Sequence, residues 1–433
     1  MLRKYLAMTY SPEQSFAREM DQRDPLRHFR SQYLFPRHAG ADCLYFCGNS
    51  LGLQPKAARA AVEEEMDRWQ RLGVKGHFEG AQPWTTYHRA LTKASMAIVG
   101  AKEEEVVIMN TLTVNLHLLM VTFYRPNPKR FKILMEAGAF PSDQYAVESQ
   151  VRHHGFDPAD AILEIEPREG EHTLRTEDIT AAIEEAGDSL ALVLFSGLQY
   201  YTGQFFDIPS ITRAAHAAGA YAGFDCAHAA GNVPLSMHEW GCDFALWCTY
   251  KYLNSGPGAL GGVFIHERHA RNTALPRFAG WWGHDEERRF LMEKGFSPIP
   301  TAEGWQLSNA PILSLAAMRP SHDLFLQAGM EALREKSVKL TGYLEFLVRQ
   351  LQRAGHPYQI ITPEEPAARG CQLSLLTGPN GRALFDFISA HGVICDWREP
   401  NVIRLAPAPM YNSFADVHTL GQLLRSFGEE SSR

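Results

Sequence analysis

Lys251 is the one charged residue in a long apolar and glycine-rich stretch of the sequence. Residues 244–264 read FALWCTYKYLNSGPGALGGVF. Burying an unpaired ammonium group costs several kcal/mol or forces the group to lose its proton. The placement therefore indicates either a side chain that reaches solvent along its apolar stem or an amine that takes part in chemistry.

Three other loops carry polar or aromatic residues directly after predicted strands. Asp225 ends the apolar run AYAGFD and is followed by His228, while Thr111 and Thr113 follow VVIM where a helix is expected to begin. The run KILME leads into a loop that contains Phe140, Pro141, Ser142 and Asp143. Ligands in open α/β sheets bind beyond the carboxyl ends of the strands, so we expect these residues to meet Lys251 there.

These loops together match the chemistry of one cofactor, pyridoxal phosphate. That cofactor needs a lysine for a Schiff base, a carboxylate beside its ring nitrogen, an aromatic side chain on its ring and a phosphate cup. Lys251, Asp225 and Phe140 supply the first three, and free backbone N–H groups at a helix start near Thr113 favour the phosphate. Asp225 taken alone could equally cap a helix. The combination predicts that Lys251 binds pyridoxal phosphate covalently.

The elements that must position these residues alternate between short apolar runs and longer amphipathic ones. Over most of residues 43–310, segments that are mostly helix-like separate six strand-like runs, which are VVIM, KILME, SLALVLFS, AYAGFD, FALWC and GGVFI. This alternation predicts an α/β fold, with a mainly parallel sheet covered by helices on both faces. We expect a large cofactor-binding domain at 43–310, whose first helix opens at Pro55.

Two further regions complete the expected organisation. Residues 311–433 begin with a long helical stretch, which Pro320 should end or kink, and continue with strands and helices that indicate a smaller C-terminal α/β domain. Residues 1–42 are expected to form an N-terminal arm or helix that packs with the small domain. A chain of 433 residues exceeds the size of one hydrophobic core, so two domains are expected.

The composition argues against several classes of protein. The net charge of −7 and the lack of a dense Lys/Arg run disfavour nucleic-acid and anionic-membrane partners. Apolar runs such as LHLLMVTF are too short to span a bilayer, and the first residues lack a signal-peptide pattern. The seven cysteines are scattered without a C-x-x-C pair, so neither a disulfide framework nor a metal site is predicted. We therefore expect a cytoplasmic enzyme.

Two short motifs allow other functions. GPGALG at 256–261 satisfies the dinucleotide-binding pattern, but a strand rather than a helix is expected after it. GNSLG at 48–52 satisfies the pattern of a hydrolase nucleophile elbow, which would make Ser50 a nucleophile. Three residues intervene before the expected helix, so a turn serine or a ligand-binding serine is favoured at this position.

Longer segments resemble one family of enzymes. The sequence from residue 46 to about residue 414 is similar to the kynureninases, which have the fold-type-I (aspartate aminotransferase-like) architecture of class V pyridoxal phosphate enzymes. The similar segments, in the family's order, are FCGNSLGLQPK, NTLTVNLHLLM, AFPSDQYAVESQ, FSGLQYYTGQ, GFDCAHAAGNV, TYKYLNSGPG, GWWGH, LSNAPI and IRLAPAPMYNSF. Many such enzymes share a lysine after an aromatic residue and an upstream Asp-x-x-His, whereas GNSLG, FPSD, TVNLHLL and GWWGH together are more specific.

The resemblance implies a role for each matching residue. Lys251 would bind the cofactor, Asp225 would pair with its ring nitrogen, and Tyr250 would lie near its phosphate. Our own hypothesis is that Tyr250 also moves protons in the later steps of the reaction. Family positions that contact the cofactor fall on Leu112, Thr113, Phe140, Pro141, Ser142, Asp143, Ser196, Asp225, His228, Tyr250, Lys251, Trp281 and Asn309. Of these, Trp281 and Asn309 would reach the cofactor across a dimer interface. Substrate-contacting positions fall on Ser50, His77, Asn309 and Arg404, and Arg404 would bind the α-carboxylate.

The implied reaction is hydrolysis of the Cβ–Cγ bond of L-kynurenine or 3-hydroxy-L-kynurenine, which gives L-alanine and anthranilate or 3-hydroxyanthranilate. It belongs to tryptophan catabolism and NAD biosynthesis, and the family implies a homodimer with shared active sites. His77 and Asn309 near the substrate's ring favour 3-hydroxykynurenine as a good substrate beside kynurenine. Other interpretations stay open, namely a class V aminotransferase, a cysteine desulfurase with a mobile cysteine such as Cys371, a serine hydrolase using Ser50, and a non-catalytic pyridoxal-binding protein.

Overall fold

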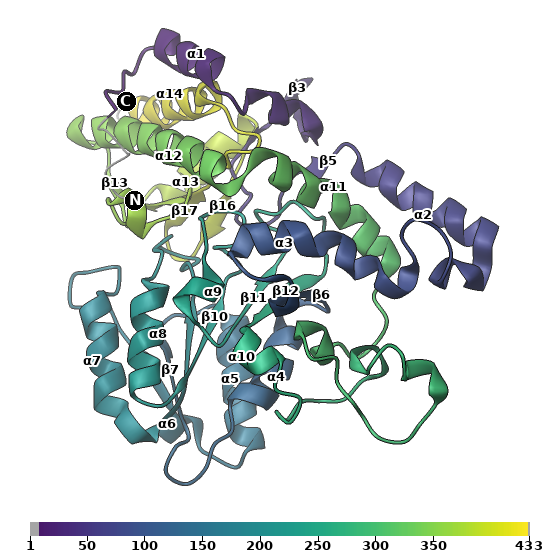
Figure 1. Ribbon diagram of the computed structural model, residues 1–433. Coiled ribbons are helices and arrows are strands. Elements are labelled where there is room, and N and C mark those ends of the chain that lie inside the picture. The colour runs from purple at the N-terminus through teal and green to yellow at the C-terminus, as the bar shows by residue number, and fades with distance from the viewer. Residues whose placement is uncertain (1–7, 432–433) are drawn as a thin grey trace.

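The central feature of the computed structural model, which describes residues 8–431, is a seven-stranded sheet (Figure 1). Its strand order is β6-β12-β11-β10-β9-β7-β8. The strands are β6 (Val106–Met109), β7 (Lys132–Glu136), β8 (Ile162–Ile165), β9 (Leu190–Ser196), β10 (Tyr221–Asp225), β11 (Phe244–Cys248) and β12 (Gly261–Ile265). Strands β8, β7, β9, β10 and β11 run parallel, whereas β12 is antiparallel to both β11 and β6. The prediction of a mainly parallel α/β sheet is confirmed.

Helices cover both faces of this sheet. Alternate strand residues point to opposite faces, so Val193 packs in one apolar cluster while its neighbours Leu192 and Leu194 pack in another. The first face carries α3 (Thr92–Val99), α7 (Thr176–Ala186) and α8 (Ile208–Ala217). Helix α11 (Ile312–Ala328) packs on α3, and α2 (Ala58–Leu72) packs on α11. The second face carries α4 (Leu112–Phe123) and α5 (Pro141–His153). Strands buried on both faces explain why their sequences are apolar throughout.

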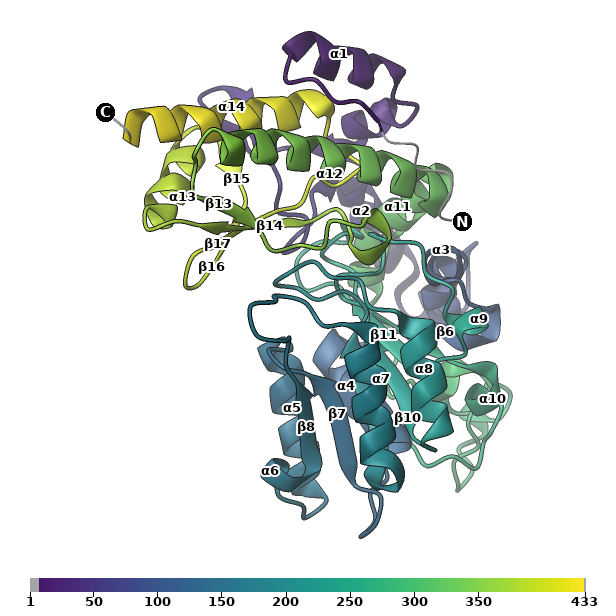
Figure 2. The same cartoon turned by 90° about the vertical axis from the view of Figure 1, so that its left-hand side faces the viewer.

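A smaller antiparallel sheet lies at the other end of the molecule (Figure 2). Its order is β13-β14-β17-β16, formed by β13 (Tyr358–Ile360), β14 (Leu373–Thr377), β16 (Asp396–Arg398) and β17 (Val402–Leu405). Helices α12 (Met330–Arg353), α13 (Gly381–Ala390) and α14 (Phe414–Ser431) pack with it, and the N-terminal helix α1 (Gln14–Arg23) lies on α14. Strand β4 (Leu44–Tyr45) pairs with β15 (Val393–Ile394) in a separate two-stranded sheet, so the chain contacts the C-terminal region before it enters the large sheet.

The expected helix start at Pro55 was wrong, and Pro320 does not end its helix. Pro55 lies in the short strand β5 (Gln54–Pro55), and α2 begins only at Ala58. Pro320 lies inside α11, which continues to its end at Gly329. Gly329 has a φ of 74°, a conformation that glycine adopts without strain, and it separates α11 from α12. The interruption in this helical region therefore comes from the glycine rather than the proline.

Short elements complete the described chain. They are β1 (Tyr33–Leu34), β2 (Arg37–His38), β3 (Ala41–Asp42), α6 (Pro158–Ala161), α9 (Met237–Trp240), α10 (Glu267–Ala270) and several turns of 3-10 helix, among them η3 (Gly73–His77), η4 (Trp84–Leu91) and η7 (Trp281–Gly283). Across residues 8–431, the structure contains no helix whose length and apolar character would let it cross a membrane.

Candidate active site

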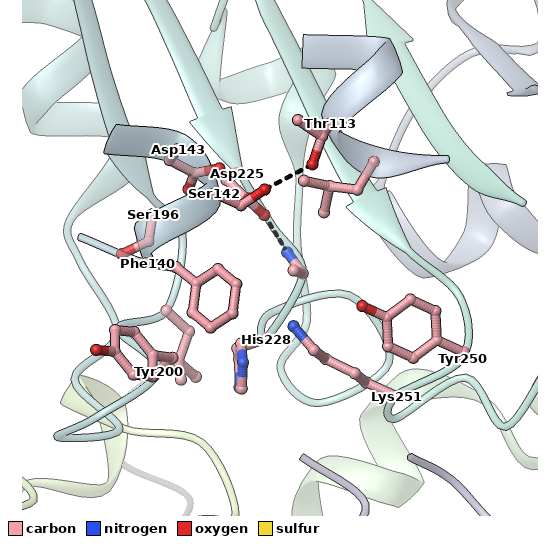
Figure 3. Close-up of a pocket in the computed structure, with 13 residues that line it drawn as sticks. Thr113, Phe140, Ser142, Asp143, Ser196, Tyr200, Asp225, His228, Tyr250 and Lys251 are labelled. Atoms are coloured by element: carbon pink, nitrogen blue, oxygen red, sulfur yellow. Dashed lines mark hydrogen bonds between the residues drawn. The ribbon is translucent and has the colours of Figure 1, made fainter. Parts of the chain in front are cut away.

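Four strand ends of the large sheet converge on one pocket, drawn in Figure 3. Asp225 and Ser196 end the parallel strands β10 and β9 and are register partners, Lys251 follows β11, and Phe140 follows β7. The pocket is partly enclosed and opens to solvent. Its lining residues are Leu112, Thr113, Phe140, Ser142, Asp143, Ser196, Leu198, Tyr200, Asp225, Ala227, His228, Tyr250 and Lys251. Ten of the residues predicted from the sequence therefore meet here.

Lys251 projects into the pocket from a tight turn after β11 (Figure 3). Its Nζ lies 5.6 Å from the centre of the Phe140 ring and 5.8 Å from that of Tyr250. Within residues 8–431 this ammonium group forms no ion pair. A half-buried amine that projects into a pocket between two aromatic rings is placed to react with a bound carbonyl group.

Gly52, the second glycine of GNSLG, supports the lysine turn. Its N–H donates to the Tyr250 carbonyl oxygen at 2.8 Å. A Cβ atom at Gly52 would collide with the backbone oxygen of Lys251 and with Asn254, so only glycine allows the two segments to lie this close. The motif thus has a structural reason to lie beside the reactive lysine.

Three carboxyl groups, those of Asp225, Asp143 and Glu136, are buried together at the sheet edge. Asp225 Oδ1 accepts the Ala227 N–H at 2.7 Å, whereas Asp143 Oδ1 has no hydrogen-bond partner within the described chain. Burial raises the pKa of all three groups, and repulsion from the other two raises that of Asp143 further, while Lys251 lowers the pKa of both aspartates. A cation placed against these acids would let them ionise, so the cluster favours a positively charged group in the pocket.

Ser196 joins the pocket to Glu136 behind it. The Glu136 carboxylate accepts the Ser196 N–H at 3.2 Å and its hydroxyl as well. Burial raises the pKa of Glu136 to about 7, and these hydrogen bonds oppose part of that rise. The sequence reasoning missed Glu136, although it ends the run KILME just as Asp225 ends AYAGFD.

His228 lines the pocket near the Lys251 amine (Figure 3). Burial lowers the pKa of its ring well below the ordinary value, and the nearby cations Lys251, Arg404 and Arg398 lower it further. The ring is therefore neutral, and its Nδ1 has no hydrogen-bond partner among the described residues. A buried nitrogen of this kind needs a polar atom that a ligand would supply.

Two helix starts face the upper end of the pocket. Thr111, the residue before α4, makes no side-chain cap, and neither does Phe140 before α5. The hydroxyl groups of Thr113 and Ser142 hydrogen-bond each other at 2.7 Å and hold the two starts together (Figure 3). Uncapped N–H groups with adjacent hydroxyls form a site suited to an anion such as phosphate.

These features fit pyridoxal phosphate. The Phe140 ring is 40% exposed beside the pocket and offers a face for a planar ring. The unpartnered Asp143 and His228 atoms, the acids that favour a cation, the anion site and the unpaired Lys251 match the polar groups of that cofactor. The pocket thus supplies a suitable partner for each of its chemical groups.

Five residues expected near the cofactor or substrate lie outside the pocket lining, and Pro141 lies between two lining residues. Trp281 is half exposed and donates its Nε1–H to the Arg289 carbonyl oxygen, and Asn309 is exposed. His77 packs edge-on against Trp84, with ring centres 5.4 Å apart. Ser50 is half-buried, and its side chain has no hydrogen-bond partner within residues 8–431.

Arg404 is the fifth of these residues, and it lies behind the pocket wall. It is 1% exposed. Its Nε and Nη2 contact the two carboxylate oxygens of Asp396 at 3.0 and 2.8 Å, and its Nη1 donates to the Tyr200 carbonyl oxygen at 2.8 Å. A guanidinium has five N–H groups, so these contacts leave one N–H on each Nη nitrogen.

The sequence reasoning also missed Leu198, Ala227 and Tyr200 in the pocket lining. The Tyr200 ring lies edge-on to that of Phe140, with centres 5.2 Å apart. It stands in the segment FSGLQYYTGQ, which was noted only as a resemblance. Its place four residues after the end of β9 was the available signal.

The cysteines and Ser50 lack the environment that the competing functions need. Cys371, the candidate for a desulfurase, is buried, and burial raises the pKa of its thiol to about 12. A reactive cysteine requires the opposite shift. Ser50 lies in a loop that leads to β5, and the next α-helix, α2, begins eight residues later, so the strand–turn–helix of a nucleophile elbow is absent.

Comparison with known sequences decides the family. A model of the aminotransferase class-V domain matches residues 45–375, and one of the kynureninase C-terminal domain matches residues 333–424. Proteins named kynureninase from Stenotrophomonas maltophilia and Myxococcus xanthus are 57% and 56% identical to the chain, covering 92% and 97% of it and 94% and 99% of their own lengths. The chain belongs to the kynureninase family.

Solved structures similar to this kynureninase-family chain share its fold. A cysteine desulfurase from Escherichia coli has a TM-score of 0.74 at 15% identity and covers 93% of this chain and 98% of its own. A C-DES mutant with glycine covalently linked to its PLP cofactor has a TM-score of 0.72 at 18% identity, and the match covers 89% of this chain and 97% of the C-DES chain. The fold-type-I architecture predicted from the sequence is thereby confirmed.

Proposed function

We propose that this protein is a pyridoxal phosphate-dependent hydrolase that cleaves the Cβ–Cγ bond of L-kynurenine to give anthranilate and L-alanine. The observation that carries the proposal is the pocket in which the unpaired Lys251 amine faces Phe140 and Asp225, in a chain of the kynureninase family. Cysteine desulfurase and serine hydrolase chemistry have less support, because Cys371 is buried and Ser50 lies outside an elbow.

The residues of the pocket would hold the cofactor as follows. Lys251 would bind it covalently, Phe140 would stack on its ring, and Asp225 would face its ring nitrogen. The starts of α4 and α5, with Thr113 and Ser142, would hold its phosphate. When bound, pyridoxal phosphate supplies an electron sink that makes bonds at the substrate's α- and β-carbons easier to break.

Two side chains would move protons during the reaction. Once it is free of the cofactor, the Lys251 amine, which projects into the pocket between Phe140 and Tyr250, would take the substrate's α-proton as a general base. Burial raises the pKa of Tyr250, so its hydroxyl stays protonated at neutral pH and can donate a proton. Asp225, ionised against the ring nitrogen, would hold the positive charge that makes the cofactor a better electron sink.

Arg404 would bind the substrate's α-carboxylate through its two remaining N–H groups. Its guanidinium carbon lies 5.8 Å from the centre of the Tyr200 ring, and Tyr200 lines the pocket. Arg404 thus lies behind the wall that Tyr200 forms, where its remaining N–H groups would fix the carboxylate end of an amino acid.

The active enzyme would be a homodimer that shares its sites. Trp281 and Asn309 match cofactor-contacting positions of the family yet lie outside the pocket lining of their own chain. Trp281 belongs to an exposed aromatic patch with Phe290 and Phe78, in which neighbouring ring centres are 5.3 and 5.9 Å apart. Contiguous exposed apolar groups of this kind mark protein interfaces, and a second copy would cover them.

The finer assignments follow from the same family. The substrate would include 3-hydroxy-L-kynurenine, and the enzyme would act in the cytoplasm in tryptophan catabolism and NAD biosynthesis. Residues 43–310 and 311–433 would act as two domains, with residues 1–42 packed on the smaller one and with α11, the first helix of the second range, packed on α2 and α3 of the first. The separate sheets support this division, and the packing of α1 on α14 supports the place of the N-terminal segment.

Anthranilate release tests the proposal directly. The purified protein with pyridoxal phosphate should release anthranilate fluorescence from L-kynurenine, and borohydride trapping should leave a cofactor adduct on Lys251 in mass spectrometry. Lys251→Arg should lose both signals, whereas Lys129→Arg, at an exposed lysine, should keep them. An active wild type without the adduct, or full activity in Lys251→Arg, would refute the mechanism.

A further inference from the structure

A cluster of three charged side chains lies beside the pocket, on the small sheet. The Asp396 carboxylate accepts hydrogen bonds from both Arg404 and Arg398. The Arg398 Nε lies 2.9 Å from Asp396 Oδ1, and its Nη2 donates to Asp396 Oδ2 at 3.2 Å. The Arg404 Nε and Nη2 lie 3.0 and 2.8 Å from the same two oxygens. One carboxylate therefore holds two guanidinium groups, each through a pair of contacts.

Strand register brings these three residues together. Strands β16 and β17 are antiparallel, and Asp396 stands directly opposite Arg404. Arg398 comes two residues after Asp396 on β16, so both side chains point to the same face of the sheet. The cluster is thus built on paired strands rather than on a loop, which limits the movement of each member.

Tyr200 connects the cluster to the pocket. The guanidinium carbons of Arg404 and Arg398 lie 5.8 and 6.0 Å from the centre of its ring, and Arg404 also holds its carbonyl oxygen. Figure 3 shows Tyr200 in the wall of the pocket, on the side away from Tyr250. The second arginine therefore lies about as close to this wall as the first.

The charges of the cluster match one carboxylate. Two guanidinium groups and one carboxylate leave a net charge of +1, which a single substrate carboxylate would neutralise. Asp396 engages the Nε edge of Arg404, so the N–H groups that remain lie on the two Nη nitrogens, the arrangement needed for a bidentate carboxylate. Arg398, whose side chain is 36% exposed, balances Asp396.

We propose that Asp396 and Arg398 are positioning residues, which orient Arg404 and keep the cluster cationic so that it selects substrates with an α-carboxylate. This proposal rests on the proposed function of Arg404. In this role Asp396 holds the Arg404 guanidinium in the orientation that binds the substrate carboxylate. In the opposite role Asp396 would compete with the substrate carboxylate for Arg404. The two roles predict opposite effects when the Asp396 charge is removed.

Two small amines separate carboxylate recognition from the rest of the site. L-Alanine carries the α-carboxylate and ethylamine lacks it, and binding of either is followed by the absorbance of the cofactor-loaded protein. Asp396→Asn should weaken L-alanine binding about tenfold and Arg398→Gln about fivefold, with ethylamine binding unchanged. For L-kynurenine, both variants should raise KM by similar factors and leave kcat nearly unchanged.

Two further variants serve as controls. Arg398→Lys keeps the charge and should retain most of the L-alanine affinity. Arg349→Gln removes an arginine of similar exposure that pairs with Glu345 and Glu364 on the same domain, and it should leave both amines unaffected. If Asp396→Asn does not fold, Arg398→Gln carries the test, because its side chain is partly exposed.

Three results would overturn the proposal. Tighter L-alanine binding in Asp396→Asn would identify Asp396 as a competitor. Equal losses for L-alanine and ethylamine would indicate a general structural effect, and unchanged L-alanine binding in both variants would remove the role entirely. The amine titrations do not depend on kynurenine cleavage, so a protein that binds L-alanine through this cluster but releases no anthranilate would refute the proposed function alone.

Discussion

The Nζ atom of Lys251 lies 5.6 Å from the centre of the Phe140 ring, although the two residues are more than one hundred positions apart in the chain. The gap is spanned by the sheet, since Phe140 follows β7 and Lys251 follows β11, with β9 and β10 between them. This spacing leaves room for a planar group between the two residues. The exposed Phe140 ring would stack on that group, and the unpaired Lys251 amine would bind it.

Replacing Phe140 with leucine should weaken cofactor binding. Leucine keeps an apolar side chain but loses the aromatic face, so the Kd for pyridoxal phosphate should rise about tenfold. Absorbance or fluorescence titration of the cofactor-free protein measures this Kd. Tyr145→Leu, which removes an exposed ring from α5, the helix that Phe140 precedes, is the matched control and should leave the Kd unchanged. Equal Kd values for wild type and Phe140→Leu would show that no ring stacks there.

Tyr250→Phe should slow turnover without loss of the cofactor. The substitution keeps the ring beside Lys251 and removes the hydroxyl that we assign to proton transfer, so kcat should fall about 100-fold. Tyr201, a half-buried tyrosine outside this pocket lining, provides the control variant Tyr201→Phe. Steady-state kinetics and the cofactor absorbance of the same samples report the two effects separately. Unchanged kcat in Tyr250→Phe would remove the hydroxyl from the mechanism.

Glu136 makes the stability of the cofactor-free protein depend on pH. Folding raises the pKa of its carboxyl from 4.5 to about 7, so between these values the folded chain holds a proton that the unfolded chain releases. The contribution is stabilising below pH 4.5 and is lost as pH rises through 7. Glu136→Gln keeps an acceptor for Ser196 and cannot ionise. The free energy of unfolding of Glu136→Gln relative to wild type should therefore increase as pH rises from 4.5 to 7, by about 3 kcal/mol at most.

Urea unfolding at pH 5 and pH 8 measures that difference. Glu164→Gln, on the neighbouring strand β8 with an exposed side chain, is the control and should show no such change relative to wild type. A stability difference between Glu136→Gln and wild type that stays constant with pH would indicate that Glu136 does not titrate in this range.

Much of the fold and most of the pocket could be predicted because their signals are local. Buried parallel strands produce apolar runs, and the residues directly after those runs reach the ligand, which is how Lys251, Asp225 and Phe140 were found. Strand β8 was missed because it is an edge strand whose residues are only partly buried, so its run is short and followed by charges. Tyr200 was missed because it stands several residues beyond its strand.

Long-range pairing explains the remaining differences. Arg404 was expected to bind substrate, but its sequence, VIRLAP, gives no sign that Asp396 and the Tyr200 carbonyl oxygen hold it from other segments. Strand register across a sheet sets these contacts, and short-range patterns do not encode it uniquely. Positions such as Trp281 and Asn309 would become part of a site only when two chains meet.

Phe290→Glu should disrupt the proposed homodimer. A buried, unpaired carboxylate in the exposed aromatic patch would be costly at an interface yet harmless on a monomer surface. Sedimentation should give twice the chain's mass for wild type and one chain's mass for the variant, with activity lost in parallel because Trp281 and Asn309 are no longer supplied. Tyr145→Glu, at an exposed tyrosine outside that patch, serves as the control. A dimeric and active Phe290→Glu would exclude this patch as the interface.

His77 should contribute to recognition of a hydroxyl group on the substrate's ring. It stands at the end of the exposed patch, where its ring lies 6.1 Å from that of Phe78, and Phe78 in turn contacts Phe290. A dimer that brings Trp281 to the partner's pocket would bring His77 toward the same region. His77→Leu should therefore lower kcat/KM for 3-hydroxykynurenine about tenfold more than for kynurenine, since only the former offers a hydroxyl to the imidazole. His153→Leu, at an exposed histidine of α5, should leave the ratio unchanged. A wild type that strongly prefers plain kynurenine, or an unchanged ratio in His77→Leu, would contradict this role.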